Sequence, residues 1–238
     1  MVQESSRVGV SEVELPQGPA RSETPIAYRA VRGGLAVAAS SYRTPGFGFI
    51  ANIFLTRLLS PADFGTFSLG MFFAQLFRLQ TKLGLNYAFG QQKETSGASV
   101  GTYALLDGAA AFSGLLLMGL AAPVLHLLGY DRLVVLVALA LSFAAMMEGL
   151  SSIAGTLLEK GLNFVVLSLP QFVIFPLSYI PAFWLATHGG GVWSLVSQTT
   201  TYSFFLLFLW WILRRTEPGL WAEPWQFNFD LARRFLRF

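Results

Sequence analysis

The chain has 238 residues, of which 54% are hydrophobic and only 12% charged. Soluble globular chains carry roughly 25% charged residues, so this composition excludes an ordinary soluble globule, and 22 Phe, 6 Trp and 7 Tyr exclude a disordered chain. The net charge of +3 fits basic residues in the loops of a membrane protein, so we expect no nucleic-acid partner; without cysteine there is no disulfide framework or thiolate metal site.

Residues 1–33 form the only long polar segment. They combine Glu4, Glu12, Glu14 and Glu23 with Ser, Pro and Arg, and they lack the basic-then-apolar order of a signal peptide. We interpret them as a flexible cytoplasmic tail.

Six apolar segments follow, each about as long as the roughly 20 residues that a helix needs to cross a bilayer. The turn after the first carries Ser60 and Pro61, a pair typical of a helix start, and Pro170, Pro176 and Pro181 predict breaks in the fifth. The fold class is therefore an all-α integral membrane protein with a six-transmembrane-helix bundle over residues 34–213. The predicted spans are residues 35–59, 64–84, 102–128, 133–158, 164–186 and 192–213.

The basic residues predict how the bundle is oriented. If the tail is cytoplasmic, most of the 16 Lys and Arg lie on the cytoplasmic side, and only Arg132 lies clearly on the outer side. Both termini are therefore predicted to be cytoplasmic. Residues 214–238 read as a cytoplasmic linker and the start of a next helix that is truncated.

Four charged residues inside the predicted spans are the main functional candidates. A charge at the centre of a membrane helix costs about 2.5–3.5 kcal/mol on insertion scales, so it is functional by default. We expect Arg43 and Arg78 to line a water-filled cavity that binds an anionic substrate, and Glu148 and Asp107 to be candidates for ion coupling. The alternative is that one of the arginines pairs with one of the acids as a tie between helices.

One enzyme-like pattern is present. His126 and Asp131 form H-x-x-x-x-D, which resembles the catalytic dyad of glycerolipid acyltransferases, but no companion phosphate-binding motif accompanies it. The other histidine, His188, is too isolated to complete a metal site. We therefore expect no enzymatic activity, no catalytic residues, no metal and no cofactor.

Three sequence motifs resemble those of a known family. Residues 56–65 (TRLLSPADFG) resemble the junction between the first two spans of Wzx-like polysaccharide and O-antigen flippases, members of the multidrug/oligosaccharidyl-lipid/polysaccharide exporter (MOP) superfamily. Residues 157–164 (LLEKGLNF) resemble their link between spans four and five, and residues 190–196 (GGVWSLV) the start of span six. Residues 229–238 are similar to the approach to span seven, so the resemblance covers about residues 30–238.

This resemblance implies a multi-pass protein of the bacterial inner membrane. Such a flippase moves an undecaprenyl-pyrophosphate-linked oligosaccharide to the outer leaflet by alternating access, in polysaccharide or lipopolysaccharide biosynthesis. Family members contain two related bundles, so the chain corresponds to the N-terminal half. The implied partners are the lipid-linked oligosaccharide, membrane lipids, and a second six-helix bundle or another copy of the chain.

Two other functions stay open at this point. One is a multidrug exporter of the same superfamily, which predicts a cavity dominated by acids. The other is a scaffold without transport activity, or a truncated remnant, that binds other proteins of polysaccharide assembly.

Overall fold

The computed structural model describes residues 45–81, 97–160, 170–216 and 227–236, and every structural statement below concerns those residues. They form helices and no strand, which confirms the all-α class for this part of the chain. The helical segments are residues 45–58, α2 (Pro61–Thr81), α4 (Gly97–Leu127), α5 (Arg132–Lys160), the π-helical turn η1 (Pro170–Ile174), α7 (Phe175–Thr187), α8 (Val192–Thr216) and α9 (Phe229–Leu236).

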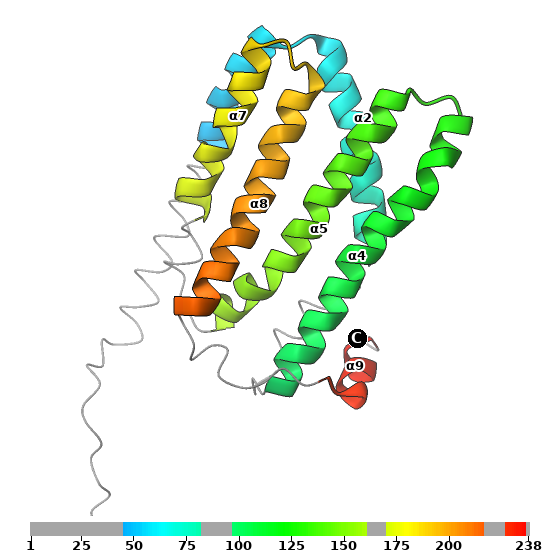
Figure 1. The fold of residues 1–238 in the computed structure, drawn as a ribbon, viewed down its shortest axis with the longest axis vertical. Coiled ribbons are helices and arrows are strands. Elements are labelled where there is room, and N and C mark those ends of the chain that lie inside the picture. The colour runs from blue at the N-terminus through cyan, green and yellow to red at the C-terminus, as the bar shows by residue number, and fades with distance from the viewer. Residues whose placement is uncertain (1–44, 82–96, 161–169, 217–226, 237–238) are drawn as a thin grey trace, which may run out of the picture.

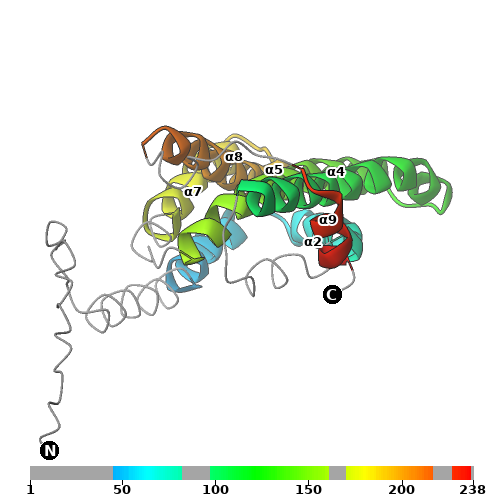
Figure 2. The ribbon, with the colours of Figure 1, turned by 90° about the horizontal axis from the view of Figure 1, so that it is seen from below.

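Helix α5 is central and packs against α2, α4 and α8. Figure 1 shows α7, α8, α5 and α4 side by side in that order, with α4 and α7 running up the page and α5 and α8 running down. Seen from below in Figure 2, α2 lies on one side of the row formed by α8, α5 and α4. The bundle therefore has two layers that meet at α2 and α5, and within the row α5 runs antiparallel to α4 and parallel to α8.

Clusters of buried apolar side chains hold these layers together. Leu55, Tyr179 and Leu195 join the helix at residues 45–58 to α7 and α8. Phe73 and Met118 belong to a second cluster, between α2, α4 and α5. Because each cluster draws on helices distant in sequence, burial of these side chains fixes how the helices are arranged.

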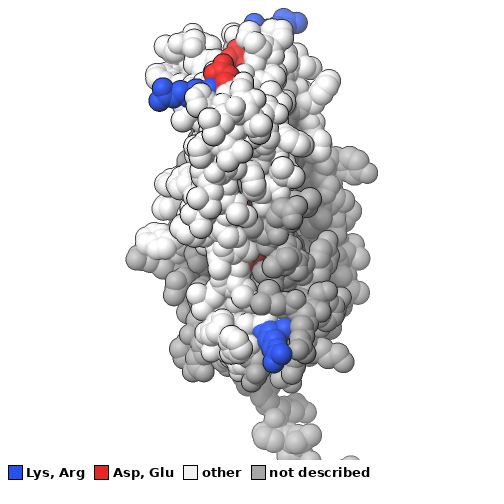
Figure 3. Space-filling model, turned by 90° about the vertical axis from the view of Figure 1, so that its right-hand side faces the viewer, with Lys and Arg blue, Asp and Glu red and all other residues white. Residues whose placement is uncertain are grey.

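The outer surface is apolar over much of its area. Large side chains such as Phe72, Phe112 and Leu120 are more than half exposed, which suits contact with lipid. Figure 3 shows one face on which Lys and Arg lie near both ends and Asp and Glu near one of them, with a small acidic spot between the ends. Two polar ends separated by an apolar middle are the pattern that a bilayer requires.

Each predicted span coincides with helical structure wherever it is described. Three segments are long and apolar enough to cross a membrane: Ala98–Leu127, Arg132–Thr156 and Val192–Leu209, which match the third, fourth and sixth predicted spans. The fifth is a shorter apolar helix, Phe172–Thr187, whose regular geometry is interrupted at its start by the π-helical turn η1 at Pro170. The breaks predicted at Pro176 and Pro181 are not found: Pro176 lies in the first turn of α7, where a missing N–H is tolerated, and α7 continues through Pro181. The number of crossings and the cytoplasmic placement of both termini stay predictions.

The structure describes part of the predicted C-terminal segment but none of the predicted N-terminal tail. The tail predicted over residues 1–33 lies outside the described residues. Part of the segment predicted over residues 214–238 is described and contains α9, which docks on the start of α4. The backbone N–H of Asn228 donates to Thr102 Oγ1 over 3.0 Å, and Ala232 is buried against the bundle.

The turn before α2 is built by a capping box. The Asp63 carboxylate accepts hydrogen bonds from the Ser60 backbone N–H over 3.0 Å and from the Ser60 hydroxyl over 2.6 Å. In return, Ser60 Oγ accepts the Asp63 backbone N–H over 3.3 Å. Pro61 takes the first helical position, where a missing N–H costs nothing. The helix start expected from Ser60 and Pro61 is confirmed.

The same carboxylate reaches the start of α8. Asp63 also accepts the backbone N–H of Val192, the first residue of α8. Gly191 precedes it with φ of +52°, and a Cβ there would lie 2.8 Å from Asp63 Oδ1. Only glycine fits this position, because it tolerates positive φ and leaves room for the carboxylate.

Candidate functional site

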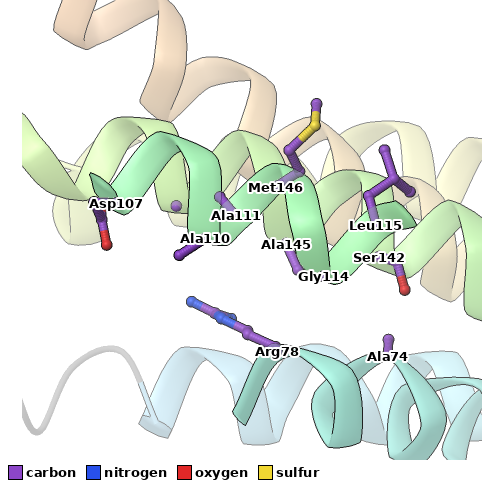
Figure 4. A pocket seen from close by; sticks show the side chains of 11 residues that line it. Ala74, Arg78, Asp107, Ala110, Ala111, Gly114, Leu115, Ser142, Ala145 and Met146 are labelled. Carbon is purple, nitrogen blue, oxygen red and sulfur yellow. The ribbon is translucent and has the colours of Figure 1, made fainter. Parts of the chain in front are cut away.

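The candidate site is a small cavity between α2, α4 and α5 (Figure 4). Its lining residues recur every three or four positions, so each helix contributes one face. The volume of about 20 Å³ is room for about one water molecule and is far too small for a sugar. The lining residues are Ala74 and Arg78 of α2; Asp107, Ala110, Ala111, Gly114 and Leu115 of α4; and Ser142, Ala145, Met146 and Gly149 of α5.

Small residues bring α4 and α5 close together around this cavity. A Cβ on Gly149 would lie 2.7 Å from the Cβ of Ala111, and one on Gly108 would meet Leu150 Cδ2 at 3.4 Å. Such close backbone approach is typical of helix pairs in membranes. It leaves little space on this side of the site.

Arg78, which lines the cavity, forms a bidentate ion pair with Glu148 of α5. Arg78 Nη1 donates to Glu148 Oε2 over 3.0 Å, and Nη2 donates to Oε1 over 2.9 Å. The planar guanidinium fork matches the two carboxylate oxygens, which is the strongest arrangement that such a pair can adopt. The two side chains are 28% and 38% exposed, so the pair is partly buried.

Asp107 lies beside this pair and has a different partner. Its side chain is only 5% exposed and accepts the Ser152 hydroxyl over 2.6 Å. Figure 4 shows the Asp107 carboxylate and the Arg78 side chain directed into the same space between α4 and α2. Because Ser152 follows Glu148 by one helical turn on α5, the three charges occupy neighbouring levels of the bundle.

Polar groups on α8 and α5 complete the surroundings. Tyr202 of α8 interacts electrostatically with Glu148, and its ring packs edge-on against Phe175. The Ser142 hydroxyl lines the cavity, is buried, and has no hydrogen-bond partner among the described residues. A buried hydroxyl beside a one-water cavity is well placed to bind that water.

The predicted site residues can now be placed. Arg43 lies outside the described residues. Arg78 and Glu148 are in direct contact, which is the helix-tie arrangement, and Asp107 is beside them. The pairing does not decide between a tie and a transport role, so the predicted roles of Arg78 in substrate binding and of Glu148 and Asp107 in ion coupling stay predictions.

Three residues around the site were not predicted from sequence. Ser152 has a usable signal, since it lies four residues after Glu148 and therefore on the same helix face. Ser142 and Tyr202 have none, because hydroxyl residues are common in membrane helices and only the helix rotation directs these two toward the site.

His126 and Asp131, the pair that resembles an acyltransferase dyad, lie at the turn between α4 and α5. Asp131 Oδ1 accepts the backbone N–H of Leu133 over 3.1 Å and so caps the start of α5. His126 is exposed on the last turn of α4, whose end is closed by Gly129 at φ +90°. Within the described ranges, no three His, Cys, Asp or Glu side chains gather closely enough to hold a metal ion.

Comparison with known proteins gives a family. A family model described as "Polysaccharide biosynthesis protein" matches residues 54–238, which is most of the chain and includes all of the cavity-lining residues. Searches of curated proteins and of solved structures returned no match. The matched range contains the three motifs that resemble flippases, and the membrane-length helices fit a membrane protein of this pathway. The chain belongs to the polysaccharide biosynthesis protein family.

Proposed function

We propose that the chain forms a helical bundle of a flippase that moves an undecaprenyl-pyrophosphate-linked oligosaccharide across the bacterial inner membrane. The observation that carries this proposal is the Arg78 guanidinium, held inside an apolar bundle at the edge of a cavity. The family match supports a role in polysaccharide synthesis or export, and the proposal adds the substrate and the transport step.

A pyrophosphate-linked substrate needs a cation at this depth. Its negative charge is costly to bring into a medium of low dielectric constant unless a cationic, hydrogen-bonding group meets it there. Guanidinium is suited to this task because it stays charged and presents paired donors to phosphate oxygens. Arg78 is the described arginine that lies between the ends of the bundle.

The cavity must open for transport. A volume of about 20 Å³ excludes a pyrophosphate, so substrate binding requires α2 to move relative to α4 and α5. Alternating access supplies such a movement, and a second bundle or another copy of the chain supplies the opposite wall. The observed arrangement then corresponds to a closed state of this bundle.

Two alternatives predict different behaviour. A multidrug exporter would use acids for cationic substrates, and Asp107 and Glu148 are both present. The family match, which is to polysaccharide biosynthesis, favours the flippase. A scaffold would need neither Arg78 nor an opening cavity, so the arginine separates it from the proposed function.

The decisive experiment is complementation in the bacterium that encodes the chain. The gene is deleted, and surface polysaccharide and the lipid-linked precursor on the cytoplasmic leaflet are measured after complementation with wild type or Arg78→Ala. Deletion should abolish surface polysaccharide and accumulate precursor. Arg78→Ala should reduce output by about 10-fold or more, since a hydrogen bond to a charged group contributes roughly 1.5–3 kcal/mol.

Arg132→Ala is the matched control, because it removes an exposed arginine from the first turn of α5, away from the cavity-lining residues. It should support normal output at equal expression. Normal output from Arg78→Ala would reject the proposed role of the site and favour the scaffold. Unchanged polysaccharide in the deletion strain, with loss of drug resistance instead, would favour the multidrug exporter.

A further inference from the structure

The bidentate pair leaves Arg78 occupied. Glu148 uses one N–H from each terminal nitrogen of the guanidinium, the same fork that would hold two phosphate oxygens. An anion that binds face-on to this fork must therefore displace the carboxylate. Arg78 can therefore be in one of two states: paired with Glu148, where it ties α2 to α5, or bound to an anionic ligand.

We infer that the Glu148 carboxylate is the counter-ion of Arg78 while no substrate is bound. An organic diphosphate then displaces the carboxylate from the guanidinium, and Glu148 takes up a proton. This inference rests on the proposed function and adds the way in which substrate binding and proton binding are linked. The diphosphate replaces the carboxylate as the counter-ion of Arg78, and no covalent bond changes.

The proton balance follows from charge. Once displaced, the Glu148 carboxylate would be an ion in a largely apolar bundle without its cationic partner, which is unfavourable. Taking one proton from water neutralises it. When the diphosphate leaves, the carboxylic acid returns its proton to water and binds Arg78 again.

The groups around Glu148 reinforce the exchange. Arg78 faces it from α2, Tyr202 approaches it from α8, and Asp107 lies on α4 where Ser152 holds it. A second acid nearby makes a lone Glu148 carboxylate still less favourable and promotes proton uptake.

Calorimetry can count the proton. The full chain in lipid nanodiscs is titrated at pH 7 with farnesyl pyrophosphate, a short polyprenyl diphosphate, in two buffers of different ionisation enthalpy. Farnesol is the ligand control. Wild type should take up about one proton more per bound probe than Glu148→Gln, because linkage equates the difference with protonation of the displaced acid. Protons exchanged by the probe itself cancel in this comparison.

Affinity gives an independent result. Glu148→Gln should bind the probe about 10-fold or more tightly than wild type, since the competing carboxylate is gone. Glu148→Asp, whose shorter side chain holds Arg78 less well, should bind with intermediate affinity and still take up the proton. Asp131→Asn, an acid-to-amide change at the exposed start of the same helix, should match wild type in both measurements.

The outcomes separate the two proposals. Equal proton uptake and equal affinity in wild type and Glu148→Gln would overturn the exchange and leave Arg78 as an anion site that uses another edge of the guanidinium. No binding of the probe by either protein, or undiminished binding by Arg78→Ala, would overturn the exchange together with the proposed function. If Glu148→Gln does not fold, loss of proton uptake in Glu148→Asp would contradict the inference.

Discussion

Asp63 joins the start of α2 to the start of α8, two segments that are distant in the sequence. It receives hydrogen bonds from Ser60 and from the N–H of Val192, and Gly191 leaves the space for its carboxylate. Residues 56–65 and 190–196, which separately resemble flippase motifs, are thus in contact. The sequence indicated the cap on α2, but the contact with α8 depends on tertiary packing that no local pattern encodes.

Replacing Asp63 should weaken this junction in a pH-dependent way. The hydroxyl of Ser60, which donates to the carboxylate, lowers the pKa of Asp63 from its usual range. A lowered folded-state pKa stabilises the fold above the unfolded pKa, and this contribution is lost as the pH falls below about 4. Asp63→Asn should therefore reduce the free energy of unfolding by about 1 kcal/mol or less at pH 7, and this loss should shrink as the pH is lowered to 3. Thermal unfolding in detergent at both pH values measures the difference.

Asp131→Asn is the matched comparison for that measurement, because asparagine caps a helix as well as aspartate does. It should change stability little at either pH. An Asp63→Asn deficit of the same size at pH 3 and pH 7 would show that the ionised carboxylate is not what stabilises the junction.

The Arg78–Glu148 pair should be energetically coupled. Arg78→Leu or Glu148→Leu alone leaves one partly buried charge without its partner, which we expect to cost about 1–3 kcal/mol of unfolding free energy. The double variant should cost less than the sum of the two, with a coupling of about 1 kcal/mol or more. Chemical denaturation of all four proteins in one detergent provides the cycle.

Arg132→Leu combined with Glu148→Leu is the control cycle, since Arg132 is the first residue of α5, more than four helical turns from Glu148. Its effects should add to within about 0.5 kcal/mol. Simple additivity in the Arg78 cycle as well would mean that the ion pair contributes nothing to stability.

Sequence selected the charged residues but not their partners. Arg78, Asp107 and Glu148 stand out because each interrupts an apolar run, and this signal needs no structure. Which acid the arginine meets depends on how far α2 and α5 are rotated about their axes. A change of one residue turns a helix by about 100°, so small errors in the expected packing exchange the partners.

At the scale of the helices, glycine positions decide how closely elements approach. A Cβ on Gly149 of α5 would meet the Ala111 Cβ at 2.7 Å, whereas one on Gly119 of α4 meets nothing within 4 Å. Alanine has the better helix propensity by about 1 kcal/mol, so the same substitution should have opposite signs at these two positions.

Gly149→Ala should destabilise the bundle by about 1–3 kcal/mol, the usual cost of overpacking, because both methyl groups are attached directly to backbone and cannot rotate away. Gly119→Ala should be neutral or stabilising. Unfolding midpoints of the two variants against wild type test this. Stabilisation by Gly149→Ala would mean that α4 and α5 are farther apart than described.

Helix positions were better predicted than helix contacts. The third, fourth and sixth predicted spans match apolar helices because about 20 consecutive apolar residues are a strong and local signal. Boundaries are less exact: α4 starts at Gly97, five residues before the span predicted from residue 102. Polar and small residues such as Gly97 and Ser99 carry little of the apolar signal that defines a span, but a helix in contact with α9 and α5 tolerates them.

For the whole molecule, the structure places two polar landmarks at opposite ends. The turn between α4 and α5 lies at one end, and α9 docks at the other, where α4 begins (Figure 1). The excess of basic residues predicts that the α9 end is cytoplasmic. The two ends should therefore be accessible from opposite sides of the membrane.

The absence of cysteine from the sequence makes this orientation directly testable with single-cysteine variants. Arg132→Cys and Arg233→Cys replace two exposed arginines, one at each end of the bundle. A membrane-impermeant maleimide should label Arg132→Cys in intact spheroplasts and Arg233→Cys only after permeabilisation, because the reagent cannot cross the bilayer. The reverse pattern would invert the predicted topology. Labelling of both positions from one side would mean that the helices between them do not make the odd number of crossings that separates the ends.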